Sequence, residues 1–139
     1  MSAEDNQEVV RRYLEEAFNE KKTDLLYELV AEDCVDHHIP PELPKGPQGA
    51  EKWFRTVFAG LSDIRVTLYD LFAAGDKVAA RFLVSGTHDG EFLGIPATGN
   101  AVAFQAMAIV HLADGKIVEW WETGDSLTMM QQLGAVSAS

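Results

Sequence analysis

The sequence has little cysteine and little positive charge. Its single cysteine, Cys34, can form neither an intrachain disulfide nor a cysteine zinc site, so we expect a reducing, cytoplasmic location. Eleven Lys and Arg stand against 22 Asp and Glu, which gives a net charge of −11. Because this charge repels phosphate backbones, no nucleic acid partner is expected.

The sequence also lacks an apolar run that resembles a membrane span. Its longest uncharged stretch, residues 92–113, contains Gly94, Pro96 and Gly99, and therefore predicts a turn followed by a strand. The first residues do not show the basic, apolar and small-residue pattern of a signal peptide. With 47% hydrophobic and 24% charged residues, the 139 residues predict one globular domain over 1–139, with a frayed tail over 134–139.

Hydrophobic periodicity predicts three helices in the first 60 residues. Apolar residues recur at helical spacing, and helix-capping residues, or a proline suited to the first turn, stand at the expected starts. The expected helices include residues 9–18 after a cap at Ser2 and Asp5, residues from Thr23 to near Asp33, and residues from Pro47 to Gly60. Between the last two, three prolines within residues 34–45 predict a loop.

From Asp63 onward the apolar period changes to two, which predicts strands. They are expected near residues 64–68, 77–88, 101–112 and 116–123, with a short one near Val35. Helices followed by strands with short connections predict an α+β fold, with three N-terminal helices packed on one face of a curved antiparallel sheet. Such a sheet forms a cone that is open at one end, which is a natural pocket.

The turn between the last two strands determines which side chains share a face. If Ala113, Asp114 and Gly115 form a three-residue loop, His111 lies opposite Ile117 and shares a face with Glu119, Trp121 and Asp125. We favour this loop because it needs a positive φ only at the glycine. If Asp114 and Gly115 form a two-residue turn, His111 shares its face with Trp120 and Glu122.

Candidate chemical groups cluster on these strands. Desolvation in an apolar cone would raise the pKa of a carboxyl group toward neutrality and allow it to move a proton next to a carbonyl group. Alternatively, Glu119, Glu122 and Asp125 form a solvated edge, and Arg81 is either a substrate anchor or a partner for these acids. The adjacent pair His37 and His38 points to opposite sides of an extended chain, so no metal site is expected.

Several strings resemble the SnoaL-like polyketide cyclases, also known as ester cyclases, of the NTF2-like superfamily. The resemblance covers nearly the whole chain, with Trp120 in place of the histidine found in many relatives. The strings are KVAARF at 77–82, GTHDGEFLGIPATG at 86–99, DGKIVEWW at 114–121, Asp125, and QQLG at 131–134.

The resemblance implies an NTF2-like (cystatin-like) cone and a cofactor-free enzyme, often a homodimer or higher homo-oligomer. It further implies that Asp125 is the acid–base catalyst of an aldol ring closure and that His111 is a polarising donor, with Glu122 as the alternative carboxylate. The expected substrate-binding residues are Trp121, Met107, Gln105, His37, Trp53 and Arg81.

Two hypotheses on function follow. The first is a lyase or isomerase that cyclises or tautomerises a small hydrophobic carbonyl compound without a cofactor. The alternative is a non-catalytic module that binds a small hydrophobic molecule or forms oligomers. In either case we expect a homo-oligomer, because the apolar face of residues 102–110 opposite His111 is expected to lie outside the helical layer.

Overall fold

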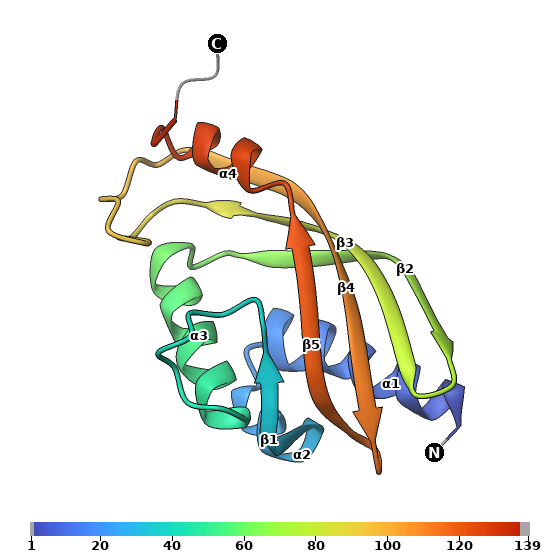
Figure 1. Cartoon of the computed structure of the whole chain (residues 1–139). Coiled ribbons are helices and arrows are strands. Elements are labelled where there is room, and N and C mark those ends of the chain that lie inside the picture. Colours follow the sequence, from blue (N-terminus) through green and yellow to red (C-terminus); the bar gives the residue numbers. More distant parts are fainter. Residues whose placement is uncertain (1, 137–139) are drawn as a thin grey trace.

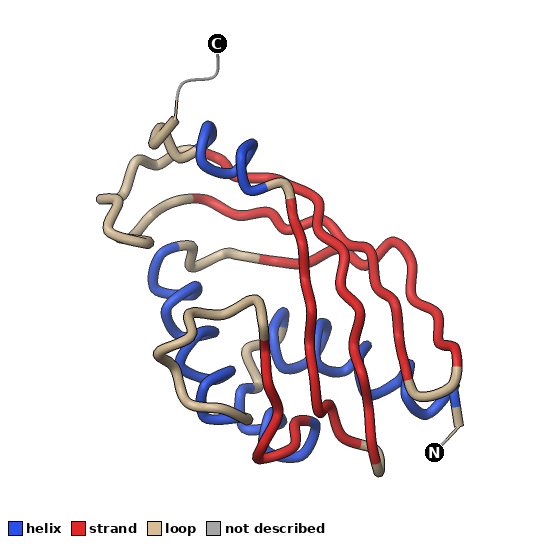
Figure 2. The backbone as a smooth tube through the Cα atoms, viewed as in Figure 1, coloured by secondary structure: helices blue, strands red, loops and turns tan. Residues whose placement is uncertain are grey.

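The computed structural model describes residues 2–136, and in it the helices cover one face of a single bent sheet (Figures 1 and 2). The five strands lie in the order β1-β5-β4-β3-β2. This arrangement confirms the α+β class and the curved sheet. The elements are α1 (Ala3–Arg12), η1 (Tyr13–Asn19), η2 (Thr23–Leu25), α2 (Leu26–Leu29), β1 (Val30–Asp36), α3 (Pro47–Gly60), β2 (Arg65–Ala74), β3 (Lys77–Thr87), β4 (Ala101–Ala113), β5 (Lys116–Gly124) and α4 (Ser126–Gln132).

The first helix begins at the expected cap and then widens. The Asp5 backbone N–H donates to Ser2 Oγ, and the Ser2 N–H donates to Asp5 Oδ2, which completes a capping box. After Arg12 the chain continues as η1, a π-helix, a rare form that occurs often at functional sites. Tyr13 and Leu14 of η1 are buried in the core.

The second expected helix is shorter than predicted, because α2 ends at Leu29 and β1 begins at Val30. The short strand expected near Val35 is therefore confirmed and spans seven residues. However, β1 runs parallel to β5, with Asp36 opposite Trp120, so the expectation of a fully antiparallel sheet is wrong here. Residues 37–115 separate the two strands, which leaves ample chain for a parallel pair.

The third helix has the expected bounds and anchors the loop that follows β3. Pro47 is its first residue, and Phe54 and Val57 are buried, whereas Trp53 is half-buried. At its end, the Gly60 carbonyl oxygen accepts hydrogen bonds from the backbone N–H groups of Asp89 and Gly90. A Cβ atom at Gly90 would lie 2.0 Å from the Ala59 oxygen, so this close approach requires glycine.

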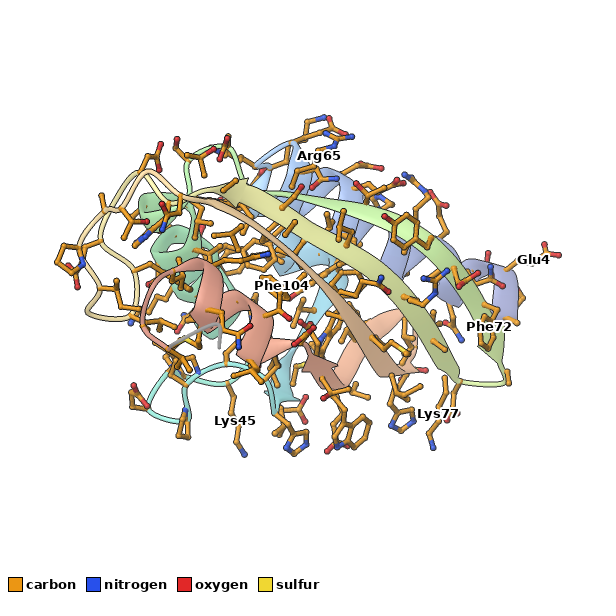
Figure 3. The ribbon with its side chains drawn as sticks, turned by 90° about the horizontal axis from the view of Figure 1, so that it is seen from above. Glu4, Lys45, Arg65, Phe72, Lys77 and Phe104 are labelled. Atoms are coloured by element: carbon orange, nitrogen blue, oxygen red, sulfur yellow. The ribbon has the colours of Figure 1, made fainter. Side chains whose placement is uncertain are left out.

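The inner face of the sheet forms the core together with the helices. On β4 it contains Val102, Ala106, Ala108 and Val110, all at most 3% exposed. Figure 3 shows the Phe104 side chain on the same, helix-facing side of β4. The expectation that this apolar face lies outside the helical layer is therefore wrong, because the helices pack against it rather than against the His111 face.

The outer edge of β2 is occupied by side chains of the first helical segment. Asn19 Oδ1 accepts from the Val66 backbone N–H at 2.8 Å, and Asn19 Nδ2 donates to the Val66 carbonyl at 2.9 Å. Gln7 Nε2 donates to the Leu71 carbonyl at 3.3 Å. These bonds satisfy backbone groups that a neighbouring strand would otherwise pair.

A short fourth helix, α4, follows β5 and ends in a hydrogen-bonded turn. The Gly134 and Ala135 N–H groups donate to the carbonyls of Gln131 and Met130, so the tail expected over 134–139 is tied to α4 at its start. Residues 137–139 lie outside the described residues. Within residues 2–136, none of the helices is long and apolar enough to cross a membrane.

Candidate active site

The hairpin between β4 and β5 differs from the favoured prediction. Asp114 (φ 51°) and Gly115 (φ 79°) form a two-residue turn, so the three-residue loop is wrong. An irregularity between His111 and Leu112 then shifts the pairing by one residue and places His111 opposite Glu119. His111 therefore shares a face with Glu119 and Trp121, as expected, but that face is the outer one.

The inner face of the sheet borders a cavity of about 390 Å³ between η1, α3 and α4. Its lining is mostly apolar and aromatic, as in small-molecule sites. Representative lining residues are Leu14, Phe18, Phe54, Val57, Phe82 and Phe104.

Three titratable side chains from β1, its following loop and β5 lie together in this cavity. Glu122 Oε2 lies 3.3 Å from His38 Nε2, and Glu122 Oε1 accepts a hydrogen bond of 3.0 Å from Trp120 Nε1. The His38 backbone N–H donates to Asp36 Oδ1 at 2.9 Å. The Glu122 side chain is only 11% exposed, so its carboxyl group is largely removed from water.

Burial shifts the protonation of all three groups. It raises the pKa of Glu122 to about 7, although the Trp120 hydrogen bond acts in the opposite direction. It also raises the pKa of Asp36 to about 6, against the effect of the His38 backbone N–H. Burial lowers the pKa of His38, while the charge of Asp36 opposes that change. Near neutral pH the cluster can therefore both accept and release a proton.

Aromatic side chains surround this acidic cluster. The Tyr13 ring lies 4.6 Å from the Trp120 ring, centroid to centroid, and burial holds the pKa of the Tyr13 phenol well above its usual value. Trp53 lies 6.1 Å from the His38 ring in an edge arrangement and 6.2 Å from Phe92. The cavity thus offers flat apolar surfaces beside acid–base groups.

Of the predicted site residues, Glu122 and Trp53 line the cavity. The remaining predicted residues lie outside it, and most of those on the outer sheet face have other partners. His37 Nε2 lies 2.6 Å from Glu119 Oε2, and the His37 ring stacks on Trp121 at 5.3 Å. Arg81 Nε donates to Asp70 Oδ2 at 2.6 Å, and Met107 and Gln105 are exposed.

Asp125 and His111, the expected catalytic pair, are not brought together in the cavity. Asp125 caps α4: its Oδ1 accepts from the Thr128 backbone N–H at 3.0 Å, and its Oδ2 accepts from Thr128 Oγ1 at 2.6 Å. These bonds lower the pKa of Asp125, the reverse of the expected shift. His111 Nε2 lies 2.9 Å from Asp76 Oδ2 near the other end of β4. The expected placement was wrong because it assigned the cavity to the wrong sheet face.

Two cavity residues, Asp36 and His38, were not among the predicted site residues. Alternation along an extended chain was the available signal, because residues two apart point to the same side while His37 points to the other.

Within the part of the chain that the structure describes, no group of three or more His, Cys, Asp or Glu residues could hold a metal ion.

Comparison with known proteins identifies the family of this chain. A model of the SnoaL-like polyketide cyclases matches residues 8–133. The aklanonic acid methyl ester cyclase DauD of Streptomyces sp. (strain C5) is 30% identical over 135 residues, which cover 91% of this chain and 80% of DauD.

Solved structures agree with this assignment. TsrD from Streptomyces laurentii superposes with a TM-score of 0.89 at 29% identity, covering 98% of this chain and 99% of TsrD. Wild-type IdmH from Streptomyces antibioticus has a TM-score of 0.79 at 33% identity, covering 93% of this chain and 98% of IdmH. The chain belongs to the SnoaL-like polyketide cyclase family.

Proposed function

We propose that this protein is an ester cyclase that closes a ring in a small hydrophobic carbonyl compound by acid–base catalysis. The observation that supports the proposal is the buried Glu122 carboxyl group, which lies beside His38 in an apolar cavity and has a pKa raised to about 7. Glu122 replaces Asp125 as the proposed base. The relative DauD is an aklanonic acid methyl ester cyclase, so a polyketide methyl ester is the proposed substrate class.

The proposed reaction is an intramolecular aldol addition. The Glu122 carboxylate removes a proton from a carbon next to a carbonyl group, which leaves an enolate. The enolate carbon attacks a second carbonyl carbon of the same molecule, so a carbon–carbon bond forms and the carbonyl oxygen becomes an alkoxide. The Glu122 carboxylic acid then returns its proton to that oxygen. No oxidant, reductant or cofactor is needed for this sequence.

The surrounding residues support the two states that Glu122 must adopt. The Trp120 N–H stabilises the ionised carboxylate before proton removal, and the His38 ring lies beside it. The apolar lining disfavours charge and therefore keeps the acid and base forms close in free energy near neutral pH. A base so balanced contributes about 10²–10⁴-fold in rate.

The test is ring closure of aklanonic acid methyl ester by the wild type and by Glu122→Gln. The amide keeps the shape of the side chain and loses the proton chemistry, so turnover should fall about 10²–10⁴-fold while substrate affinity stays nearly unchanged. Asp70→Asn, on the outer face, is the matched control and should be fully active. Full activity of Glu122→Gln would overturn the assignment of the base. Substrate binding without any turnover by the wild type would favour the binding-module alternative.

We further propose that the protein is a cytoplasmic homo-oligomer that associates through the outer face of its sheet. The support is a group of large apolar side chains on the sheet strands that are 39–62% exposed: Tyr69, Phe72, Met107, Ile109 and Trp121. The cytoplasmic location is proposed because Cys34 is a buried free thiol.

A further inference from the structure

The loop of residues 88–100 is held firmly at its ends and brings two side chains to the cavity. The His88 N–H donates to the Asn100 carbonyl, and the Gly99 N–H donates to the His88 carbonyl, so the two ends of the loop are closed together. Asp89 also accepts a hydrogen bond of 3.0 Å from the Ser62 backbone N–H. From this base the loop extends to Phe92 and Leu93, which line the cavity.

Leu93 has a backbone conformation that is unfavourable for leucine. The Phe92 and Ile95 backbones exchange two hydrogen bonds, of 3.0 and 2.9 Å, around a two-residue turn made of Leu93 (φ 52°) and Gly94 (φ 79°). Both positions of such a turn need a positive φ, which Asn, Asp and Gly adopt at a lower energetic cost than leucine does. Local strain of this kind is often found at binding sites.

The chain contains a second turn with nearly the same angles and a conventional sequence. Asp114 (φ 51°) and Gly115 (φ 79°) join β4 to β5 at the end of the sheet away from α4 and the 88–100 loop (Figure 1). There the first position is an aspartate, as turn chemistry favours. The geometry of the turn therefore does not explain why residue 93 is a leucine.

The position of the Leu93 side chain supplies an explanation. It is 53% exposed and yet lines the cavity, beside the buried Phe92 ring that contacts Trp53. The other cavity-lining residues that are exposed to solvent are His38, Thr123, Gly124 and Ser126. Leu93 is the apolar side chain of this exposed set, so it lies at the opening of the cavity, where the other exposed lining residues are polar or glycine.

We propose that Leu93 is a specificity-determining residue, retained in a strained turn so that an apolar side chain covers the opening of the cavity. It selects ligands whose part at the opening is an alkyl or aryl group rather than a charged one. The inference rests on the cavity being the ligand site of the proposed function. It does not depend on the chemistry at Glu122.

The experiment compares Leu93→Asn with Leu93→Met and measures thermal stability and the affinity for Nile red, a neutral aromatic dye. Asparagine tolerates the left-handed region, so Leu93→Asn should raise Tm by about 3 °C. It removes the apolar contact and should weaken Nile red binding about 5-fold or more. Methionine keeps an apolar side chain and the strain, so Leu93→Met should leave both Tm and the dye affinity close to the wild-type values.

Asp114→Leu is the matched control, because it places leucine in the equivalent turn far from the cavity. It should lower Tm by about 3 °C and leave the Nile red affinity unchanged. Unchanged dye affinity in Leu93→Asn would overturn the proposal, and so would a fall in its Tm. Because dye binding involves no proton transfer, inactivity of the wild type toward a methyl ester would count against the proposed reaction without changing this result.

Discussion

Asp36 lies opposite Trp120 in the parallel pairing of β1 with β5, and this register brings His38 next to Glu122. Glu122 on β5 and His38 in the loop after β1 thus come from segments that are adjacent in the sheet but far apart in the sequence. On β5 itself, the Trp120 indole lies beside the Glu122 carboxylate that it stabilises, because residues two apart on a strand point to the same side. The chemistry proposed for the cavity therefore depends on one strand orientation.

The protonation of Glu122 should make the stability of the protein depend on pH. Folding raises the pKa of the Glu122 carboxyl group from 4.5 to about 7. Between these two pH values the folded state therefore binds more protons than the unfolded state. The stability contributed by the protonated group is present below pH 4.5 and is lost as pH rises through 7.

Glu122→Gln lacks this titration. Relative to the wild type, the variant should gain on the order of 2–3 kcal/mol in unfolding free energy between pH 4.5 and 8. Urea unfolding at several pH values measures the difference. The neighbouring Asp36, His38 and Tyr13 remain in both proteins, so their titrations largely cancel. A difference that is independent of pH would contradict the raised pKa.

Trp120→Phe should move the pH profile of turnover. The indole N–H stabilises the ionised form of Glu122, and its removal should raise the pKa of that carboxyl group by up to about one unit. The rise of turnover with pH should then shift upward by the same amount. Trp121→Phe is the control because Trp121 lies on the outer face, and its profile should be that of the wild type. Identical profiles for both variants would exclude Glu122 as the titrating base.

Asp125→Ala should affect stability rather than catalysis. The aspartate accepts two hydrogen bonds from Thr128 at the start of α4, and loss of such a cap costs about 1 kcal/mol. Asp125→Asn should retain most of the capping and thus the unfolding free energy. Both variants should turn over substrate within a few-fold of the wild type. A loss of 100-fold or more in the stable Asn variant would restore Asp125 as the catalytic residue.

Ile109→Glu should disrupt the proposed oligomer. Ile109 is 46% exposed on the outer face and lies opposite Trp121 on β5, so a carboxylate there would place charge inside the proposed interface. Light scattering at tens of micromolar should give the monomer mass for this variant and a multiple of it for the wild type. Lys52→Glu, on the exposed side of α3, should assemble like the wild type. A monomeric wild type would refute the proposal.

Local patterns in the sequence were sufficient for most of the fold. The Ser2 and Asp5 cap, Pro47 at the start of α3, and the strict alternation along β3 are short-range signals, and the structure confirms each of them. The end of α2 was missed because Val30 is compatible with either a helix or a strand, and its pairing with distant β5 decides between them.

The candidate site was harder to predict, for a physical reason. Alternation identified which side chains share a face but not which face the helices cover. Both faces of β4 contain apolar residues: Val102 and Val110 on one, Met107 and Ile109 on the other. The choice between them depends on the packing of α1 and α3, which is a long-range property. His111 and Asp125 were predicted to lie in the cavity because the face of β4 that carries His111 was taken as the face covered by the helices.

The hydrogen bonds of Asn19 and Gln7 to β2 have a consequence for how copies of the protein can meet. An open sheet normally presents a free border that can add strands from other molecules and so grow into fibrils. Here one amide side chain satisfies both backbone groups of Val66, and another occupies the Leu71 carbonyl. Growth by adding a strand is thereby obstructed at this border. The protein can then keep exposed apolar side chains on the outer face of its sheet with a lower risk of polymerising edge to edge.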